Sequence, residues 1–301
     1  MIFPKSLESA IVFTIITYSC TIALFIVWNK FLSQKVSKSR ESGFAILGDP
    51  LFRIIASLSM FIPLVSLLVL SMIYSVGIEG FLGFTIEWIR VDFRVVIEYF
   101  LAPIAPIIAL IMYLKIIEFF RMFKYEDYSR IVGSRSILSY RTFLIVLLGY
   151  VAGITINAVF AFGEEIGWRA FLTTTLSKYF SIPITVILVG IVWGLWHTPL
   201  VLSLRNTIMK IVPWATTRIA IVNYIISCIV LSYPLTLLLL SSNSIAPPSA
   251  FHGTLNALWQ IPQFVTSIRE DHRYRDIVKM IIASVIAWCI GILIIVLIVS
   301  L

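Results

Sequence analysis

Two adjacent carboxylates and a guanidinium lie close together in the stretch FGEEIGWRAF, which runs from Phe162 to Phe171. Long apolar runs flank this stretch on both sides. An ionisable side chain near the centre of a membrane helix costs roughly 2.5–3.5 kcal/mol, and such side chains usually face a functional site. Glu164, Glu165 and Arg169 are therefore the first candidates for chemistry.

The spacing of these three residues predicts two different carboxylates. In a helix, Glu165 and Arg169 are four residues apart, so they share a face and can form an ion pair. Glu164 is rotated from Glu165 by about 100° and points elsewhere. A carboxylate without a partner in apolar surroundings suits a general base. The alternative is a polar cluster at a helix start, where carboxylates are favoured.

Two further stretches place polar side chains in apolar surroundings. His197 lies in VWGLWHTPL, four residues after Trp193, whose indole could pack on the imidazole. His252 and Asn256 lie in FHGTLNALW, four residues apart on one helical face, and both can donate hydrogen bonds. Taken singly, each could be a satisfied core residue or a polar contact between membrane helices.

The histidine count favours a shared site. The chain has three histidines, and His272 lies in the charged stretch REDHRYRD, where it is expected to be solvated. The other two join two carboxylates, an arginine and an amide in three separate apolar segments. One buried site that uses all of them is the simplest explanation of the set.

The composition indicates a membrane protein. Of the 301 residues, 60% are hydrophobic and 13% are charged, whereas a soluble domain is about 25% charged. The net charge of +8 comes mainly from basic residues in short loops, so nucleic-acid binding is not expected. Cys20, Cys228 and Cys289 lie in apolar runs and suggest neither a disulfide framework nor a metal site.

The apolar runs predict an all-α polytopic bundle of about eight transmembrane helices in a single membrane domain, residues 1–301, with its motifs within 162–259. The first run is read as a retained helix rather than a signal peptide. The predicted spans are Ile11–Trp28, Ile54–Tyr74, Val96–Glu118, Thr142–Phe162, Ile182–Leu202, Ile219–Leu240, Ser249–Val265 and Met280–Leu301. The seventh is the weakest, because polar residues interrupt it.

Loop charges support an even number of crossings. Sixteen of the 23 Lys and Arg residues fall in the loops after spans one, three, five and seven. The alternate segments hold five, which are Lys5, Arg90, Arg94, Arg169 and Lys178. Because cytoplasmic loops are rich in Lys and Arg, both ends of the chain are expected outside the cytoplasm.

In order along the chain, EEIGWR, WGLWH and HGTLN resemble the three motifs of the CAAX-protease and bacteriocin-processing (CPBP) family of intramembrane glutamic endopeptidases. The family pattern is E-E-x-x-x-R, an aromatic residue four positions before a His as in Trp193/His197, and H-x-x-x-N. The resemblance covers about one third of the chain, from Phe162 to Trp259. Ala170 departs from the pattern, since many members have Gly after the Arg, but it removes no chemical group.

The resemblance implies a membrane protease that uses no metal and forms no acyl-enzyme. Glu164 would take a proton from a water also held by His197. His252 and Asn256 would donate to the developing oxyanion. Glu165 and Arg169, with Trp193, would support these four.

Other interpretations remain open. Glu164, His197 and His252 could supply three zinc ligands, which would make zinc the cofactor of a membrane metalloprotease. A non-catalytic scaffold or immunity protein could keep the polar set as contacts between helices. A transporter is less attractive, because no inverted repeat is evident.

The expected partners are the lipid bilayer and a membrane-associated protein or peptide substrate, and a substrate prenylated at its C-terminus is one candidate. A multi-pass protein of a prokaryotic cell membrane is expected, with the endoplasmic-reticulum membrane as the alternative. One difficulty is depth: the fifteen residues from Ile182 to His197 span roughly 22 Å, so His197 and Glu164 fall at opposite ends of their spans. We therefore expect a break near Phe162–Gly163 or in the seventh span.

Overall fold

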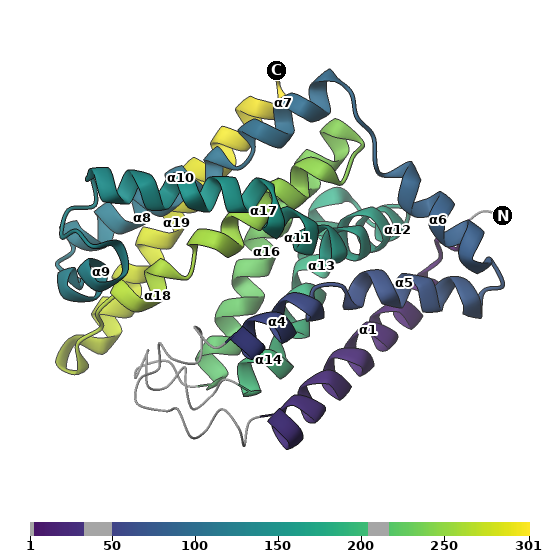
Figure 1. Cartoon of the computed structure of the whole chain (residues 1–301), viewed down its shortest axis with the longest axis horizontal. Helices are drawn as coiled ribbons and strands as arrows, with labels where there is room; N and C mark the ends of the chain where they lie inside the picture. The colour runs from purple at the N-terminus through teal and green to yellow at the C-terminus, as the bar shows by residue number, and fades with distance from the viewer. Residues whose placement is uncertain (1–2, 33–49, 204–216) are drawn as a thin grey trace.

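Helices make up nearly all of the described chain (Figure 1). The computed structural model describes residues 3–32, 50–203 and 217–301. Within these ranges the only β pairing is an isolated bridge between Phe123 and Thr266. The predicted all-α membrane bundle is thus confirmed. The α-helices are α1 (Leu7–Val27), α4 (Pro50–Ser59), α5 (Ile62–Ile73), α6 (Gly77–Glu87), α7 (Phe93–Leu101), α8 (Ile104–Phe119), α9 (Tyr125–Val132), α10 (Tyr140–Ile154), α11 (Ile156–Glu165), α12 (Thr174–Leu176), α13 (Ile182–Trp196), α14 (Thr198–Ser203), α16 (Thr217–Ser242), α17 (Ala246–Leu258), α18 (Ile261–Val265) and α19 (Arg273–Val299). Two π-helices, η1 (Trp28–Leu32) and η3 (Ile166–Thr173), and a 3₁₀ turn, η4 (Glu270–His272), complete the described elements.

The number of membrane-crossing helices is lower than predicted. In the described ranges six helical segments are long and apolar enough to cross a bilayer, and a bent pair makes a seventh. The predicted span Ser249–Val265 is not one of them, because α17 ends at Leu258 and α18 begins at Ile261, next to Pro262. The thirteen residues of α17 extend about 20 Å, which is too short for a bilayer core of about 30 Å.

The bent pair solves the depth difficulty, although this bend lies at neither of the two places where we predicted a break. The predicted break in the seventh span is confirmed, since α17 ends at Leu258 and α18 begins at Ile261. Tyr140–Ile154 and Ile156–Leu176 meet at 50°, so the break lies at Thr155 and not at Phe162–Gly163. Thr155 donates its hydroxyl to the carbonyl of Val151, four residues earlier. Such back-bonding often bends helices. After the bend, α11 carries Glu164 and Glu165 toward the middle of the bundle.

Helix α17 is enclosed by the other helices and lies near the centre of the bundle (Figure 1). It packs against α10 and α11, and also against α7, α8 and α16. Its residues from Pro247 to Leu255 are all buried. Because α17 is covered by protein rather than lipid, its ends do not need to reach the membrane surface.

Described basic segments gather as the loop-charge pattern predicts. Lys178 donates to the backbone of Lys5, and Arg94 donates to the carbonyl of Val299, so the sparsely basic segments share one end with both chain termini. At the other end, the backbone of Lys124 donates to Val265, which joins two of the Lys/Arg-rich loops. Lys35, Lys38, Arg40, Arg205 and Lys210 belong to the other rich loops and lie outside the described residues.

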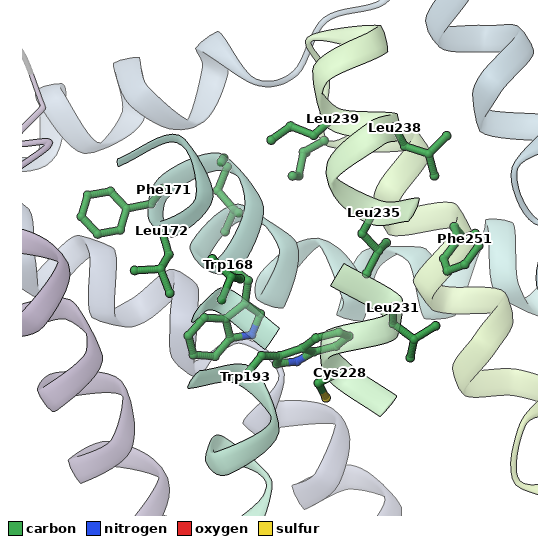
Figure 2. Close-up of a cluster of buried hydrophobic side chains, with 14 of the residues drawn as sticks. Trp168, Phe171, Leu172, Trp193, Cys228, Leu231, Leu235, Leu238, Leu239 and Phe251 are labelled. Atoms are coloured by element: carbon green, nitrogen blue, oxygen red, sulfur yellow. The ribbon is translucent and has the colours of Figure 1, made fainter. Parts of the chain in front are cut away.

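An apolar core surrounds the segment that carries the first motif. Trp168, Phe171 and Leu172 of η3 lie in one cluster with Trp193 of α13 and with Cys228, Leu231 and Leu235 of α16 (Figure 2). Phe251 of α17 belongs to the same cluster. Three of the helices that carry polar motifs are therefore held together by one apolar core, which excludes water around them.

Candidate active site

The first motif is buried completely. The exposed fraction is 3% for Glu164 and 0% for both Glu165 and Arg169. The two glutamates end α11, and the arginine lies in the π-helix η3. Short π-helical segments within α-helices occur frequently at functional sites. The alternative of a polar cluster at a helix start is wrong, because the carboxylates stand at the C-terminal end of α11.

Glu165 forms the predicted ion pair and also a hydrogen bond to His252 that the sequence did not indicate. Its Oε2 lies 3.2 Å from Nε of Arg169. Its Oε1 lies 2.8 Å from Nδ1 of His252, which comes from α17. A buried charge needs both a counter-ion and hydrogen bonds, and Glu165 has these from two helices. It therefore joins the first and third motifs directly.

Trp193 joins the second motif to the other two. Its indole Nε1 donates to Oε2 of Glu164 over 2.7 Å. The guanidinium carbon of Arg169 lies 4.2 Å from the centre of its ring. The ring of His252 meets Trp193 edge to face, with centroids 5.3 Å apart. The Trp193 side chain thus contacts all three of these residues, and Glu164 is hydrogen-bonded to it, whereas Glu165 pairs with Arg169.

His197 caps the C-terminal end of α13 and is held by that helix and by α16. Its Nδ1 lies 2.9 Å from the carbonyl oxygen of Trp193. Since a carbonyl only accepts, Nδ1 is the protonated nitrogen, and Nε2 of the neutral ring remains an acceptor. The predicted packing of Trp193 on His197 is confirmed, with ring centroids 5.9 Å apart.

Asn256 follows His252 by one turn of α17 and is only partly buried. Its Nδ2 points to the sulfur of Met60, 3.9 Å away, at the junction of α4 and α5. The same junction packs on Gly163, where a Cβ would lie 2.8 Å from the carbonyl oxygen of Met60. Asn256 and the first motif therefore face the same short segment of the chain, and among the described residues the amide has only the weak sulfur acceptor as its partner.

Residues 139–258 match the family model described as type II CAAX prenyl endopeptidase Rce1-like. We name this part of the chain the Rce1-like domain, after the family that it resembles. It begins at Ser139, the N-cap of α10, and ends at Leu258, the last residue of α17, so it includes all three motifs and the bend. The match supports a membrane-embedded peptide hydrolase of the CAAX type. No curated protein is significantly similar to the chain.

Sequence reasoning missed two residues of the Rce1-like domain that contact the site. Tyr224 stacks on His197 with ring centroids 4.9 Å apart, and the sulfur of Cys228 lies 3.9 Å from Nδ1 of the same ring. Both belong to α16, which carries none of the three motifs. The one available signal was their four-residue spacing, which places them on one face of the predicted span Ile219–Leu240.

The donor geometry of the Rce1-like domain bears on the zinc alternative. Among the residues that the structure describes, no three His, Cys, Asp or Glu side chains are grouped to hold a metal ion. Glu164 accepts from Trp193 and His252 is bonded to Glu165, so both are already engaged. Metal-free catalysis stays a prediction, and it is tested below with a chelator.

Proposed function

We propose that the chain is an intramembrane endopeptidase in which Glu164 activates a water for attack on a peptide bond. The observation that carries the proposal is the double contact of Trp193. Its indole N–H reaches Glu164, while its carbonyl oxygen orients His197. The carboxylate of Glu164 and the imidazole of His197 are therefore both held by Trp193 of α13. A water between these two side chains could be bound by both.

The first step follows from the acceptor atoms of these two side chains. The water donates one hydrogen to Glu164 and the other to Nε2 of His197, so its lone pair is free to attack the scissile carbonyl carbon. Glu164 takes the proton as the carbon–oxygen bond forms. The protonated Glu164 then transfers this proton to the leaving amine as the carbon–nitrogen bond breaks. Neither step requires a covalent intermediate with the protein.

His252 and Asn256 donate to the oxyanion that forms on the carbonyl oxygen. His252 has its Nδ1 on Glu165, so its Nε2 carries a hydrogen when the ring is cationic. The Asn256 amide adds a second donor one turn away. Preorganised donors of this kind are worth about 2.7–4 kcal/mol each.

Glu165, Arg169 and Trp193 support the reacting groups. Glu165 holds His252, and Arg169 balances Glu165 while its guanidinium lies over the indole of Trp193. Removing one partner from such a buried network leaves an uncompensated charge, which costs about 3–5 kcal/mol. We therefore assign these three residues to positioning rather than to proton transfer.

The substrate that the proposal names is a membrane-associated protein with a prenylated C-terminal CAAX sequence, from which the C-terminal peptide is removed. Support comes from the family match over residues 139–258. The buried position of the motifs adds to it, because a substrate tethered to the bilayer by a lipid reaches a site at membrane depth without leaving the membrane. Unprenylated membrane peptides and secreted precursors are the competing substrates.

The test is hydrolysis of quenched fluorescent peptides by the protein purified in detergent. The panel pairs each farnesylated CAAX peptide with the same peptide unfarnesylated. Glu164→Gln keeps the shape of the side chain and should lower kcat by about 10²–10⁴-fold. Glu79→Gln is the matched control, because Glu79 lies exposed on α6, and its activity should equal that of the wild type.

Each result has a definite reading. Activity that survives a zinc chelator and falls in Glu164→Gln supports the proposal. Loss of activity in the presence of the chelator would indicate a zinc-dependent mechanism. Full activity of Glu164→Gln removes this residue from the chemistry. A folded wild-type protein that cleaves none of the peptides favours the non-catalytic scaffold.

A further inference from the structure

Aromatic rings from two helices contact the imidazole of His197. On one side Tyr224 of α16 lies nearly parallel to it, at 4.9 Å between centroids and 20° between planes. On another side Trp196 meets it edge to face at 5.0 Å. Since the backbone bond to Trp193 fixes only one atom of the ring, its neighbouring rings must limit rotation about that bond, and Tyr224 is the one that covers a face of the imidazole.

Two glycines of α13 bring α16 close enough for this contact. A Cβ at Gly190 would lie 2.4 Å from the Cα of Ile229, and one at Gly194 would lie 2.5 Å from the Cα of Ile225. The two backbones therefore touch, as small residues four apart allow in membrane helices. Tyr224 directly precedes Ile225, so the close approach at Gly194 sets the height at which the tyrosine ring meets His197.

We propose that Tyr224 is a positioning residue that holds the His197 imidazole in the orientation that catalysis requires, through its ring face and not its hydroxyl. The inference rests on the proposed function, in which Nε2 of His197 holds the attacking water. None of the hydrogen bonds among the described residues involves the Tyr224 hydroxyl, whereas the ring lies within stacking distance. Offset or parallel aromatic pairs contribute about 0.5–1.5 kcal/mol beyond burial, enough to select one ring orientation.

The variants separate stacking from simple filling of space. Tyr224→Phe keeps the ring and should keep kcat within about twofold of the wild type, since only a hydroxyl is lost. Tyr224→Leu keeps an apolar side chain against α13 but removes the ring face. We expect kcat to fall by about 10- to 100-fold with KM unchanged, because small misplacements of catalytic groups have effects of that size.

A double-mutant cycle tells positioning from general loss of packing. In a His197→Ala background, Tyr224→Leu should cause no further loss of activity, because the group on which Tyr224 acts is already absent. Equal losses in the two backgrounds would overturn the inference, and so would a loss in Tyr224→Phe as large as that in Tyr224→Leu.

A second readout does not depend on catalysis. With ¹⁵N-labelled histidine, the ring nitrogens of His197 can be assigned by comparison with His197→Ala, and the chain has only three histidines. The wild type and Tyr224→Phe should show one tautomer with the proton on Nδ1, and Tyr224→Leu should show a mixture. An unchanged tautomer in Tyr224→Leu refutes the inference even if the protein cleaves no peptide, whereas a changed tautomer without activity refutes only the proposed function.

Discussion

Gly253 is the position where a single methyl group should disturb the site most. It lies next to His252, where α17 crosses the bend between α10 and α11. A Cβ there would lie 2.3 Å from the carbonyl oxygen of Gly153, 2.7 Å from the nitrogen of Ala158 and 2.8 Å from the carbonyl carbon of Asn157. All three are backbone atoms, so no side chain can rotate out of the way.

The expected effect of Gly253→Ala has two parts. Ordinary contacts to a Cβ begin at 3.4 Å, so α17 must move away from the bent pair by about 1 Å, and overpacking of this kind typically costs about 1–3 kcal/mol. The same movement lengthens the 2.8 Å contact between His252 and Glu165. Because displacements near 1 Å can cost about 100-fold in rate, the activity of the folded protein should fall by about that factor in addition to the loss of stability.

The control is Gly83→Ala on α6, where a Cβ meets nothing within 4 Å. In a helix this change is expected to stabilise by about 0.8–1 kcal/mol. Thermal unfolding in detergent, followed by tryptophan fluorescence, and peptide hydrolysis should be measured for both variants. If Gly253→Ala unfolds and cleaves like Gly83→Ala, the close approach of α17 to the bend is not what positions His252, and the reasoning fails.

Three further changes test other contacts. Trp193→Phe removes the donor to Glu164 but keeps a ring, so stability should fall by about 1–3 kcal/mol in denaturant titrations, and kcat of peptide hydrolysis should fall while KM stays constant; unchanged kcat would contradict the assigned hydrogen bond. Glu98→Ala should lower Tm, because Glu98 of α7 is 1% exposed and pairs with Arg94. An unchanged Tm would mean that the pair contributes nothing to stability. Asp276→Ala removes the acceptor of three hydrogen bonds from Arg269, so limited proteolysis before α19 should become faster than in the wild type.

Contacts within one motif were predictable from the sequence, and contacts between motifs were not. The Glu165–Arg169 pair follows from a spacing of four residues, which a helical turn brings together. The bond between Trp193 and Glu164 joins positions 29 residues apart, and no local rule fixes which face of α13 turns toward α11. The stacking of Tyr224 on His197 depends in the same way on how closely α16 approaches two glycines of α13.

The fold class was equally predictable, but the depth of its elements was not. Apolar runs of about 20 residues identify spans because the bilayer sets their length. This rule does not apply to helix α17, since the length of a helix covered by protein need not match the thickness of the bilayer. The bend at Thr155 could not be predicted either, because the sequence does not show which threonine hydroxyl bonds to the carbonyl four residues earlier. The pairing of Glu98 with Arg94 follows from their spacing of four residues, whereas its second contact, with Ser241, joins positions 143 residues apart and could not be read from the sequence.

The order in which the buried charges find their partners has a consequence for biogenesis. A chain is made from its N-terminus, so Glu164, Glu165 and Arg169 leave the ribosome before Trp193 and well before His252, which is 87 residues beyond Glu165. During that interval the ion pair of Glu165 with Arg169 is the only charge compensation that the segment carries within itself. The bent pair of α10 and α11 is therefore made with only part of its final charge compensation. His252 reaches Glu165 only after α17 is made, so the site is complete only once this central helix has joined the bundle.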